Sequence, residues 1–157
     1  MQAIAPKLVW DPDVACDATG HGGGWIGTAP AWPLDRTAPA ELDPFLDDAK
    51  LLVVVACPEA YPAASPRVYP VDPAPEITVR TQHRWHINGD GSICLWQNAY
   101  DWWPATLAAH IIPKVSGWFL EYLLLTRGHV AAMTTNGIAH NDEFDHLLTA
   151  VNAGEPA

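Results

Sequence analysis

The apolar residues in the first half of the chain occur in short runs that end at proline, glycine or aspartate. Runs of this kind predict β-strands rather than helices. The strongest run, at 50–57, has a Val-Val-Val core without polar alternation, and we expect a central strand buried on both faces. Weaker runs predict strands at 7–10 and 25–28, and the sequence at 41–48 predicts a helical turn.

The stretch 58–75 contains six prolines in eighteen residues. Proline has no N–H to donate, so it is excluded from the interior of a sheet. We therefore expect an extended connector that contains an edge strand centred on 67–69, followed by a further short strand at 77–80.

The second half of the chain has helical periodicity. A helix is expected to begin at Pro104, which suits a first turn, with Asp101 or Trp103 near its cap. Pro113 lacks the N–H that would bond the carbonyl four residues earlier, so we expect a kink or break there. Arg127-Gly128 predicts the end of the helix. Apolar residues at steps of three or four form one face: Leu107, Ile111, Val115, Trp118, Tyr122 and Leu125.

A last short helix is expected over 142–151, with Asn141 as its N-cap, before a frayed tail from 152. Strands therefore come first and helices second, with no internal repeat and no linker. This order predicts a single α+β domain over 1–157, an antiparallel sheet of about four strands with C-terminal helices packed against it.

Eight basic and eighteen acidic residues give a formal net charge of −10. No basic cluster offers phosphate contacts, so the composition argues against nucleic acid as a partner. The most apolar run is interrupted by Glu121 and is too short to span a bilayer. The N-terminus has no basic region followed by an apolar core. We therefore expect a cytoplasmic protein with no membrane partner.

The chain has three cysteines, and their spacing matches no metal site. An odd number of thiols favours a reduced setting. Cys57, in the expected central strand, is predicted to be a small buried hydrophobe, and Cys16, in a polar loop, to be incidental. The seven histidines match no ligand spacing either, so we expect no metal and no other cofactor.

Cys94 differs from the other two because it follows a glycine-rich turn at 89–92 and precedes a loop bounded by tryptophans. A nucleophilic cysteine needs access, a stabilised thiolate and N–H donors for the oxyanion. The turn can present backbone N–H groups, and His86 lies eight residues before the cysteine. On spacing alone, a buried structural thiol beside a turn explains the pattern equally well.

The motifs around this cysteine resemble those of the ubiquitin-conjugating enzymes. That family has Tyr-Pro-x-x-Pro-Pro-x-Val, His-Pro-Asn, Gly-x-Ile-Cys-Leu and Trp-Ser-Pro in this order. Its steps of eight and ten residues from the cysteine to the tryptophan and the proline are kept in this chain. The matching residues are Tyr61-Pro62, Ser65 to Val68, Gly91 to Leu95, and Trp102 with Pro104.

The divergent prokaryotic members of bacterial antiphage operons are more similar still. They share Pro-x-Val, His-x-aromatic, Asp-Gly-Ser-x-Cys-Leu-aromatic and Ile-Ile-Pro-x-x-x-x-Trp patterns. The resemblance covers about residues 50–128. The matching residues are Pro66 to Val68 with Asp72-Pro73, His83 to Trp85, Asp90 to Trp96, Ile111 to Pro113, Trp118, Phe119 and Tyr122.

The resemblance implies an α+β fold of the UBC-like type with its catalytic core at about 50–128. It implies that Cys94 accepts the C-terminus of a ubiquitin-like protein, as a thioester, from an activating-enzyme-like protein. Transfer to an amine, a lysine of a target protein, would follow. The activating enzyme spends the ATP, so this subunit needs no cofactor. A deconjugating metallopeptidase accompanies such enzymes in one type of operon.

The chain departs from the family pattern around the cysteine. The oxyanion asparagine of the family stands eight residues before the cysteine, where this chain has His86. Asn88 is nearby but out of register, so either residue can be the donor. His83 resembles the histidine of His-x-aromatic, and a structural role is expected for it rather than a catalytic one. Asp90 and Asp101 are candidates to orient an incoming lysine, with solvated turn acids as the alternative.

Two further departures concern neighbouring elements. Trp103 replaces the serine before Pro104, which removes the usual helix cap. The N-terminal half lacks a clear long helix, so the first helix is expected to be short or absent. In the family that helix helps to dock the activating enzyme.

Three other functions stay open at this point. A non-catalytic binding module of the same fold would typically lose the cysteine. A conjugating subunit of the cyclic-oligonucleotide defence systems would act on a nucleotidyltransferase. An unrelated cysteine hydrolase using Cys94 and His86 would need a third orienting group, which the sequence does not clearly supply.

Overall fold

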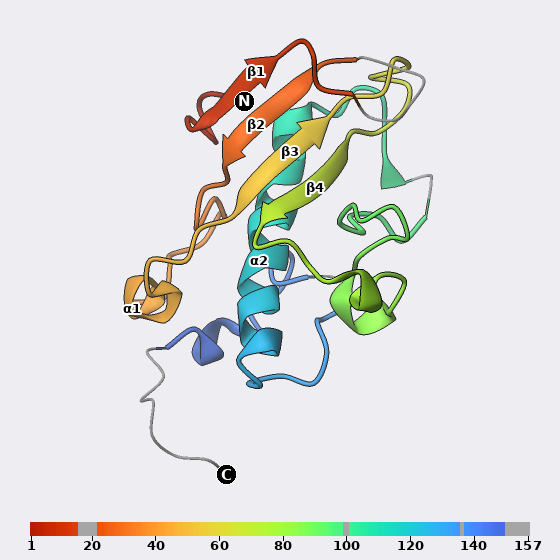
Figure 1. Ribbon diagram of the computed structural model, residues 1–157. Coiled ribbons are helices and arrows are strands. Elements are labelled where there is room, and N and C mark those ends of the chain that lie inside the picture. Colours follow the sequence, from red (N-terminus) through yellow and green to blue (C-terminus); the bar gives the residue numbers. More distant parts are fainter. Residues whose placement is uncertain (16–21, 99–100, 136, 150–157) are drawn as a thin grey trace.

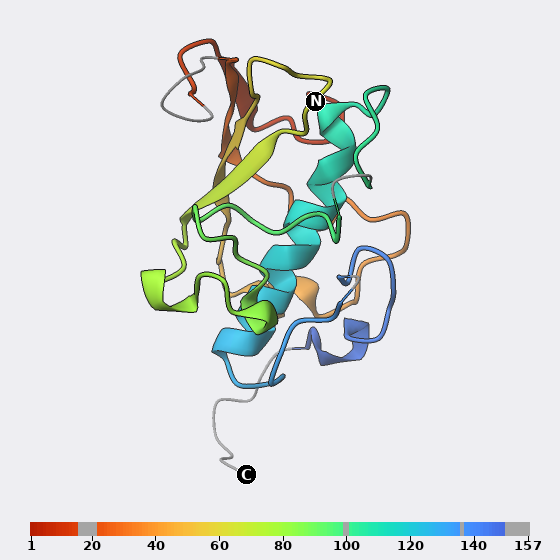
Figure 2. The same cartoon turned by 90° about the vertical axis from the view of Figure 1, so that its right-hand side faces the viewer.

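The computed structural model describes residues 1–15, 22–98, 101–135 and 137–149 (Figure 1). Four strands form one antiparallel sheet in which each strand pairs with the next along the chain. One long helix lies across one face of this sheet (Figures 1 and 2). The α+β class and the four expected strands are therefore confirmed. The elements are β1 (Leu8–Asp11), β2 (Gly24–Thr28), β3 (Leu52–Ala56), β4 (Arg67–Asp72) and the helix α2 (Ile112–Thr126).

The central strand β3 is buried on one face only. Val53 and Val55 have no exposed surface and belong to the core beneath α2. Val54 points to the opposite face and is half-buried. On that face Val9 is 68% exposed and Ile26 is 36% exposed, in register with it. The expectation of a strand buried on both faces is wrong, because no described helix covers the outer face (Figure 2).

The expected edge strand and helical turn are both present. β4 forms the edge of the sheet, and α1 (Leu42–Leu46) places Phe45, 1% exposed, in the core. Residues 77–80 do not add a strand, because η1 (Ile77–Val79) is a 3-10 turn. The chain leaves the sheet through Pro73 and Pro75, which have no N–H to continue a ladder.

The helix α2 begins later than its periodicity predicts. Residues 104–107 are not helical, and η4 (Ala108–Ile111) is a 3-10 turn. Pro113 lies in the first turn of α2, where its missing N–H is not needed, so it starts the helix instead of kinking it. Leu107, assigned to the apolar face, is 61% exposed. The predicted end is confirmed, with Gly128 at φ +78° just beyond the helix.

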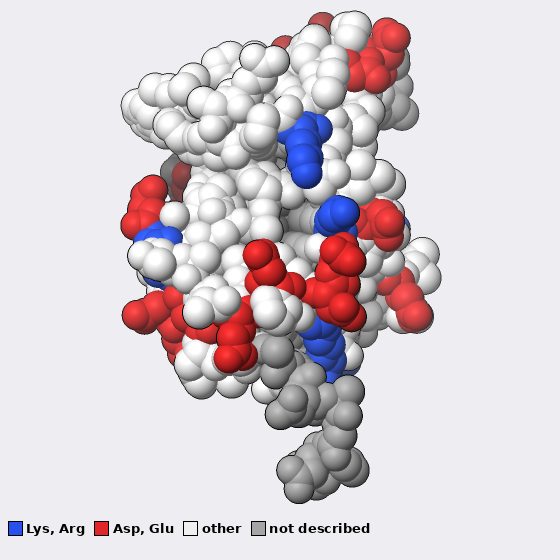
Figure 3. Space-filling model, turned by 90° about the vertical axis from the view of Figure 1, so that its left-hand side faces the viewer, with Lys and Arg blue, Asp and Glu red and all other residues white. Residues whose placement is uncertain are grey.

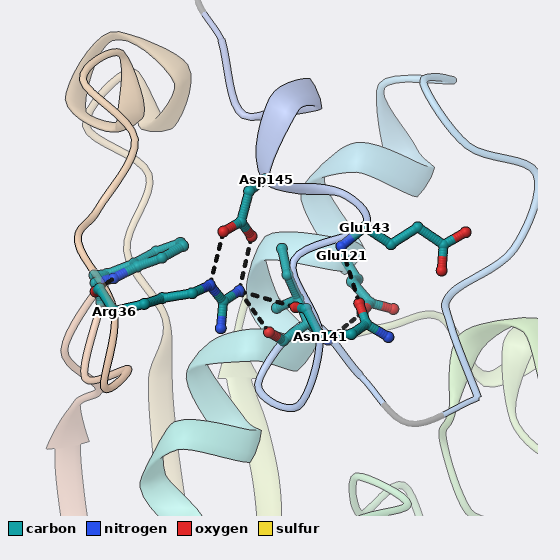
Figure 4. A network of polar contacts seen from close by, with 7 residues as sticks. Arg36, Glu121, Asn141, Glu143 and Asp145 are labelled. Atoms are coloured by element: carbon teal, nitrogen blue, oxygen red, sulfur yellow. Dashed lines mark hydrogen bonds and ion pairs between the residues drawn. The ribbon is translucent and has the colours of Figure 1, made fainter.

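The C-terminal segment folds back along α2 without forming the expected helix over 142–151. Its described part contains only the 3-10 turn η5 (Asp145–Leu147), although Asn141 accepts the expected capping hydrogen bond. The segment is held instead by Arg36, which donates to the Asp145 carboxylate at 2.7 Å (Figure 4). The tail expected to fray from 152, and Cys16, lie outside the described residues.

The surface carries the acidic excess that the composition predicts. On the face shown in Figure 3, Asp and Glu side chains gather in the lower half, the end of the molecule where α1 lies. The upper part of this face is mostly uncharged. No helix in the described part of the chain is both long and apolar enough to cross a membrane.

Candidate active site

A short hairpin carries Cys94 away from the edge of the sheet. The Cys94 N–H donates to the His86 carbonyl at 2.7 Å, and Ile87 pairs with Ile93 in an antiparallel bridge. The Ile93 N–H in turn donates to the Val68 carbonyl of β4 at 2.8 Å, which ties the hairpin to the sheet. The residue eight positions before the cysteine is therefore its direct backbone partner.

The glycine-rich turn closes this hairpin as the sequence predicts. Gly91 adopts φ +88°, a left-handed conformation that glycine tolerates best, and a side chain there would meet the Arg80 guanidinium at 3.1 Å. The Asp90 carboxylate accepts hydrogen bonds from the Ser92 N–H at 2.9 Å and hydroxyl at 2.7 Å. Through these contacts Asp90 stabilises the turn.

Asp90 also remains charged at neutral pH. Its burial opposes ionisation, but the Ser92 hydrogen bonds outweigh that effect, and the Arg67 charge at 3.4 Å assists them. Together they hold the pKa of the Asp90 carboxyl below its ordinary value. Its second carboxylate oxygen faces the Tyr69 hydroxyl at 3.5 Å.

The Asn88 side chain is engaged within the turn. Its amide nitrogen donates to the Ser92 hydroxyl at 3.0 Å and lies 3.4 Å from the Ile93 carbonyl. An amide nitrogen has two N–H groups, and both have acceptors here. Asn88 therefore has to break an existing hydrogen bond before it can donate to an oxyanion at Cys94.

His86 has the opposite environment. It follows the 3-10 turn η2 (His83–Trp85), adopts φ 47°, and packs its ring 5.2 Å from that of His83. Burial and the His83 charge lower the pKa of His86, opposed by a hydrogen bond with the Thr134 backbone, so its imidazole is neutral at pH 7. Its Nε2 atom is enclosed and has no hydrogen-bond partner.

The Cys94 thiol lies between two hollows. It is half-buried, and its Sγ lies 3.6 Å from the Trp96 carbonyl oxygen. We call the two spaces the large hollow, about 580 Å³, and the small hollow, about 320 Å³. Cys94, Leu95 and Trp96 line both, as do Asn88 and Ile93, so the Cys94–Trp96 segment is part of the wall between them.

The two hollows are lined by different titratable and charged side chains. The large hollow is lined by His83, His86, Lys114 and Glu121 together with apolar and uncharged polar side chains. The residues that line the small hollow include Asp90 and Arg67, which form an ion pair at 3.4 Å. Cys94 therefore borders one space that contains the two histidines and another that contains the Asp90–Arg67 ion pair.

Asp101 stands apart from the reacting centre. Its carboxylate accepts the N–H groups of Gln97 at 3.0 Å and Asn98 at 3.1 Å, and it is not among the described residues that line either hollow. It shapes the loop after the cysteine, so the structure does not place it beside an incoming amine.

The Tyr-Pro and Trp-x-Pro motifs meet in space. The Trp102 ring lies 6.3 Å from that of Tyr61, and its indole N–H donates to the Pro62 carbonyl at 2.9 Å. The Tyr61 hydroxyl accepts the Ala108 N–H at 3.3 Å. Trp103, in contrast, is 69% exposed. The motifs therefore pack the 3-10 turn that leads into α2 against the proline-rich connector.

Sequence reasoning missed two charged residues of α2 that line the large hollow, Lys114 and Glu121. Lys114 contacts the segment after Cys94, and Glu121, 1% exposed, binds Thr134 and Ile138. The one feature of the sequence that could have indicated them is that each is a charged residue within an otherwise apolar helix. Among the described residues, no group of three or more His, Cys, Asp or Glu side chains is arranged to hold a metal ion.

No protein-family model, curated protein or solved structure matches this chain.

Proposed function

We propose that this protein is a ubiquitin-conjugating-like enzyme of the UBC-like fold that carries a ubiquitin-like protein as a thioester on Cys94. The observation that supports it most directly is the position of the thiol, half-buried between two hollows at the end of a hairpin. The order of the motifs in the sequence adds to this support, as does the contact of Trp102 with Tyr61 and Pro62.

The chemistry has two acyl-transfer steps. In the first, the Cys94 thiolate attacks the thioester of an activating-enzyme-like protein, a new C–S bond forms, and the activating enzyme's thiolate leaves. In the second, an uncharged amine of a target lysine attacks the carbonyl. The C–N bond forms, the C–S bond breaks, Cys94 leaves as thiolate, and the amine proton passes to solvent.

His86 is a better candidate than Asn88 for the side chain that donates a hydrogen bond to the oxyanion. Both N–H groups of the Asn88 amide already have acceptors, whereas His86 Nε2 has no partner. His86 also pairs with the cysteine through its carbonyl, so its ring is carried on the same hairpin. Nε2 can donate only when it carries the proton of the neutral ring. The imidazole therefore has to give up its hydrogen bond with the Thr134 backbone and move so that Nε2 opens to the large hollow.

Asp90 is the proposed contact for the target lysine. It lines the small hollow, on the other side of the Cys94–Trp96 wall from His86. Its ionised carboxylate can hold an approaching ammonium group there until the proton is lost. His83, exposed on η2, is proposed to act through its contact with His86 rather than on the substrate.

The partners follow from the same proposal. They are an activating-enzyme-like protein, a ubiquitin-like protein, a target lysine and, in one type of bacterial antiphage operon, a deconjugating metallopeptidase. The setting would be the bacterial cytoplasm.

A gel assay with the full chain tests the proposal. The chain is incubated with ATP, the activating enzyme and the ubiquitin-like protein encoded beside its gene. The expected result is an adduct that persists on a non-reducing gel and disappears with a reducing agent. It should be lost in Cys94→Ala and kept in Cys57→Ala and Cys16→Ala. Cys94→Ser should give an adduct that resists reduction, because an oxygen ester forms.

The decisive negative result is the absence of any adduct when the activating enzyme demonstrably carries its own thioester. That outcome would leave a non-catalytic module of the same fold. If an adduct forms and the acceptor proves to be a nucleotidyltransferase, the protein belongs to the second type of defence system.

A further inference from the structure

The Lys114 ammonium contacts both residues that follow Cys94. Its Nζ donates to the Leu95 carbonyl at 3.2 Å and lies 4.1 Å from the centroid of the Trp96 ring. Lys114 is half-buried in the first turns of α2. Burial lowers its pKa and the Asp101 charge opposes this, which shows that the ammonium is partly withdrawn from water.

The Leu95–Trp96 backbone has few other ties. Within the described part of the chain, neither residue makes a backbone–backbone hydrogen bond. The ladder of the hairpin ends at the Cys94 N–H, and the next fixed amide is that of Gln97, which Asp101 binds. Among the described residues, the one polar contact of the Trp96 backbone is that of its carbonyl with the Cys94 thiol at 3.6 Å. Lys114 is therefore the main polar restraint on this segment.

We infer that Lys114 is a positioning residue for Cys94. It holds the Leu95–Trp96 segment in place, and that segment in turn directs the thiol through the Trp96 carbonyl. The same segment is part of the wall between the two hollows, so Lys114 also holds the boundary that separates His86 from Asp90. Lys114 does not itself touch the reacting atoms.

The catalytic consequence of this role rests on the proposed function, and it is tested by single-turnover discharge. The Cys94 thioester of each variant is purified and mixed with increasing lysine. Lys114→Met keeps the length of the stem and removes the ammonium, and it should lower the maximal discharge rate about 10- to 100-fold because misplaced groups react slowly. The lysine concentration for half-maximal rate should stay the same. Lys114→Arg keeps a donor and a cation–π partner and should remain within about threefold of wild type.

A second measurement does not depend on conjugation. Alkylation of each cysteine by iodoacetamide is followed by mass spectrometry in the free protein. Lys114→Met should raise the rate at Cys94 about fivefold, since a released segment exposes the thiol. Cys57, 2% exposed, reports global unfolding and should stay unreactive in all variants. Lys7→Met and Lys50→Met are matched controls, because these two lysines line a separate hollow of about 570 Å³.

The outcomes are separable. If wild type forms no thioester, the proposed function fails, and the alkylation rates still decide the role of Lys114. If a thioester forms but Lys114→Met discharges and alkylates like wild type, the positioning role is wrong and the proposed function stands. Loss of activity in Lys114→Met with equal loss in Lys114→Arg, or with Cys57 becoming reactive, would also overturn the role.

Discussion

The Glu121 carboxylate accepts a 2.6 Å hydrogen bond from the backbone N–H of Ile138, inside the core. It also accepts the N–H and hydroxyl of Thr134, each at 2.7 Å. From the other side, Arg36 donates to the Ile138 carbonyl at 2.7 Å (Figure 4). Both polar backbone atoms of this fully buried residue are thus bound by distant side chains. Because Glu121 and Thr134 line the large hollow, these bonds hold one wall of the site.

Glu121→Gln should destabilise the protein by about 1–3 kcal/mol. Three donors point at the carboxylate, and glutamine offers one oxygen and one NH₂ group in its place. The NH₂ group would face the N–H of Thr134 or Ile138 and leave a buried donor without an acceptor. Urea unfolding of the two proteins at the same pH measures the difference. An unfolding free energy equal to that of wild type would contradict the proposed bonds.

The difference in unfolding free energy between wild type and Glu121→Gln should also depend on pH. Burial raises the pKa of Glu121 above its ordinary value of 4.5, and the hydrogen bonds from Thr134 and Ile138 offset only part of this. The folded state therefore binds the proton more tightly than the unfolded state. The stability that the Glu121 carboxyl contributes to the wild-type protein therefore falls as pH rises from 4.5 through its pKa in the folded state. We expect a larger difference in unfolding free energy at pH 5.5 than at pH 7.5. A difference that grows with pH would mean that folding lowers the pKa of Glu121.

Arg36→Lys should lower the free energy of unfolding by about 1–2 kcal/mol, because lysine cannot reproduce the planar bidentate pairing with a carboxylate. Arg36 binds both carboxylate oxygens of Asp145 at 2.7 Å and lies 5.1 Å from the centroid of the Trp32 ring. A double-mutant cycle with Asp145→Asn measures the coupling, which we expect to be about 1 kcal/mol for this partly exposed pair. Additive losses in the double mutant would mean that the pair contributes through packing alone.

Much of the sheet follows from local sequence because the runs at 8–11, 24–28 and 52–56 combine strand-forming residues with clear stops. The start of α2 was less predictable. The apolar periodicity continues smoothly from Leu107 across Pro113, and only packing shows that the first stretch is not helical. Whether the outer face of β3 is buried depends on which element covers the sheet, and the sequence of this strand alone does not show that.

The turn before Cys94 was predictable because Gly91 and Asp90 impose it locally, whereas the pairing of Ile87 with Ile93 that makes it a hairpin was not predicted. The roles of Lys114 and Glu121 were not, because each acts on a segment that is remote in the chain. The placement of Asp101 is an intermediate case. Its sequence position suggested chemistry, but its carboxylate is used by the two nearest N–H groups.

Asp90→Asn should slow discharge of the Cys94 thioester to lysine about fivefold, which is the size of a partly exposed charge contact. The asparagine oxygen can still accept the Ser92 N–H and hydroxyl, so the turn is kept while the charge is lost. Discharge to hydroxylamine, which is uncharged at neutral pH, should be almost unchanged. Asp72→Asn, an exposed acid on β4, is the control. An equal slowing with both amines would assign Asp90 to the turn alone.

His86→Asn should change how stability depends on pH. The pKa of His86 lies below its ordinary value of 6.5 because burial and the nearby His83 disfavour the imidazolium. The unfolded chain therefore binds this proton more tightly than the folded chain does, and wild type loses stability as pH falls below 6.5. The loss is limited to about 1.4 kcal/mol per pH unit for one proton. His86→Asn has no such group, so its unfolding free energy should fall less between pH 7 and pH 5.

Two histidine controls make this assignment specific. His83→Asn removes the neighbouring charge that lowers the pKa of His86, so it should reduce the acid loss of stability only in part. His140→Asn should have a smaller effect, because His140 is exposed, although burial and the Lys114 charge also lower its pKa. If His86→Asn loses stability below pH 6.5 as steeply as wild type does, His86 is charged in the folded protein. A charged imidazole has a proton on both nitrogens, and it would bring a positive charge to the oxyanion at Cys94.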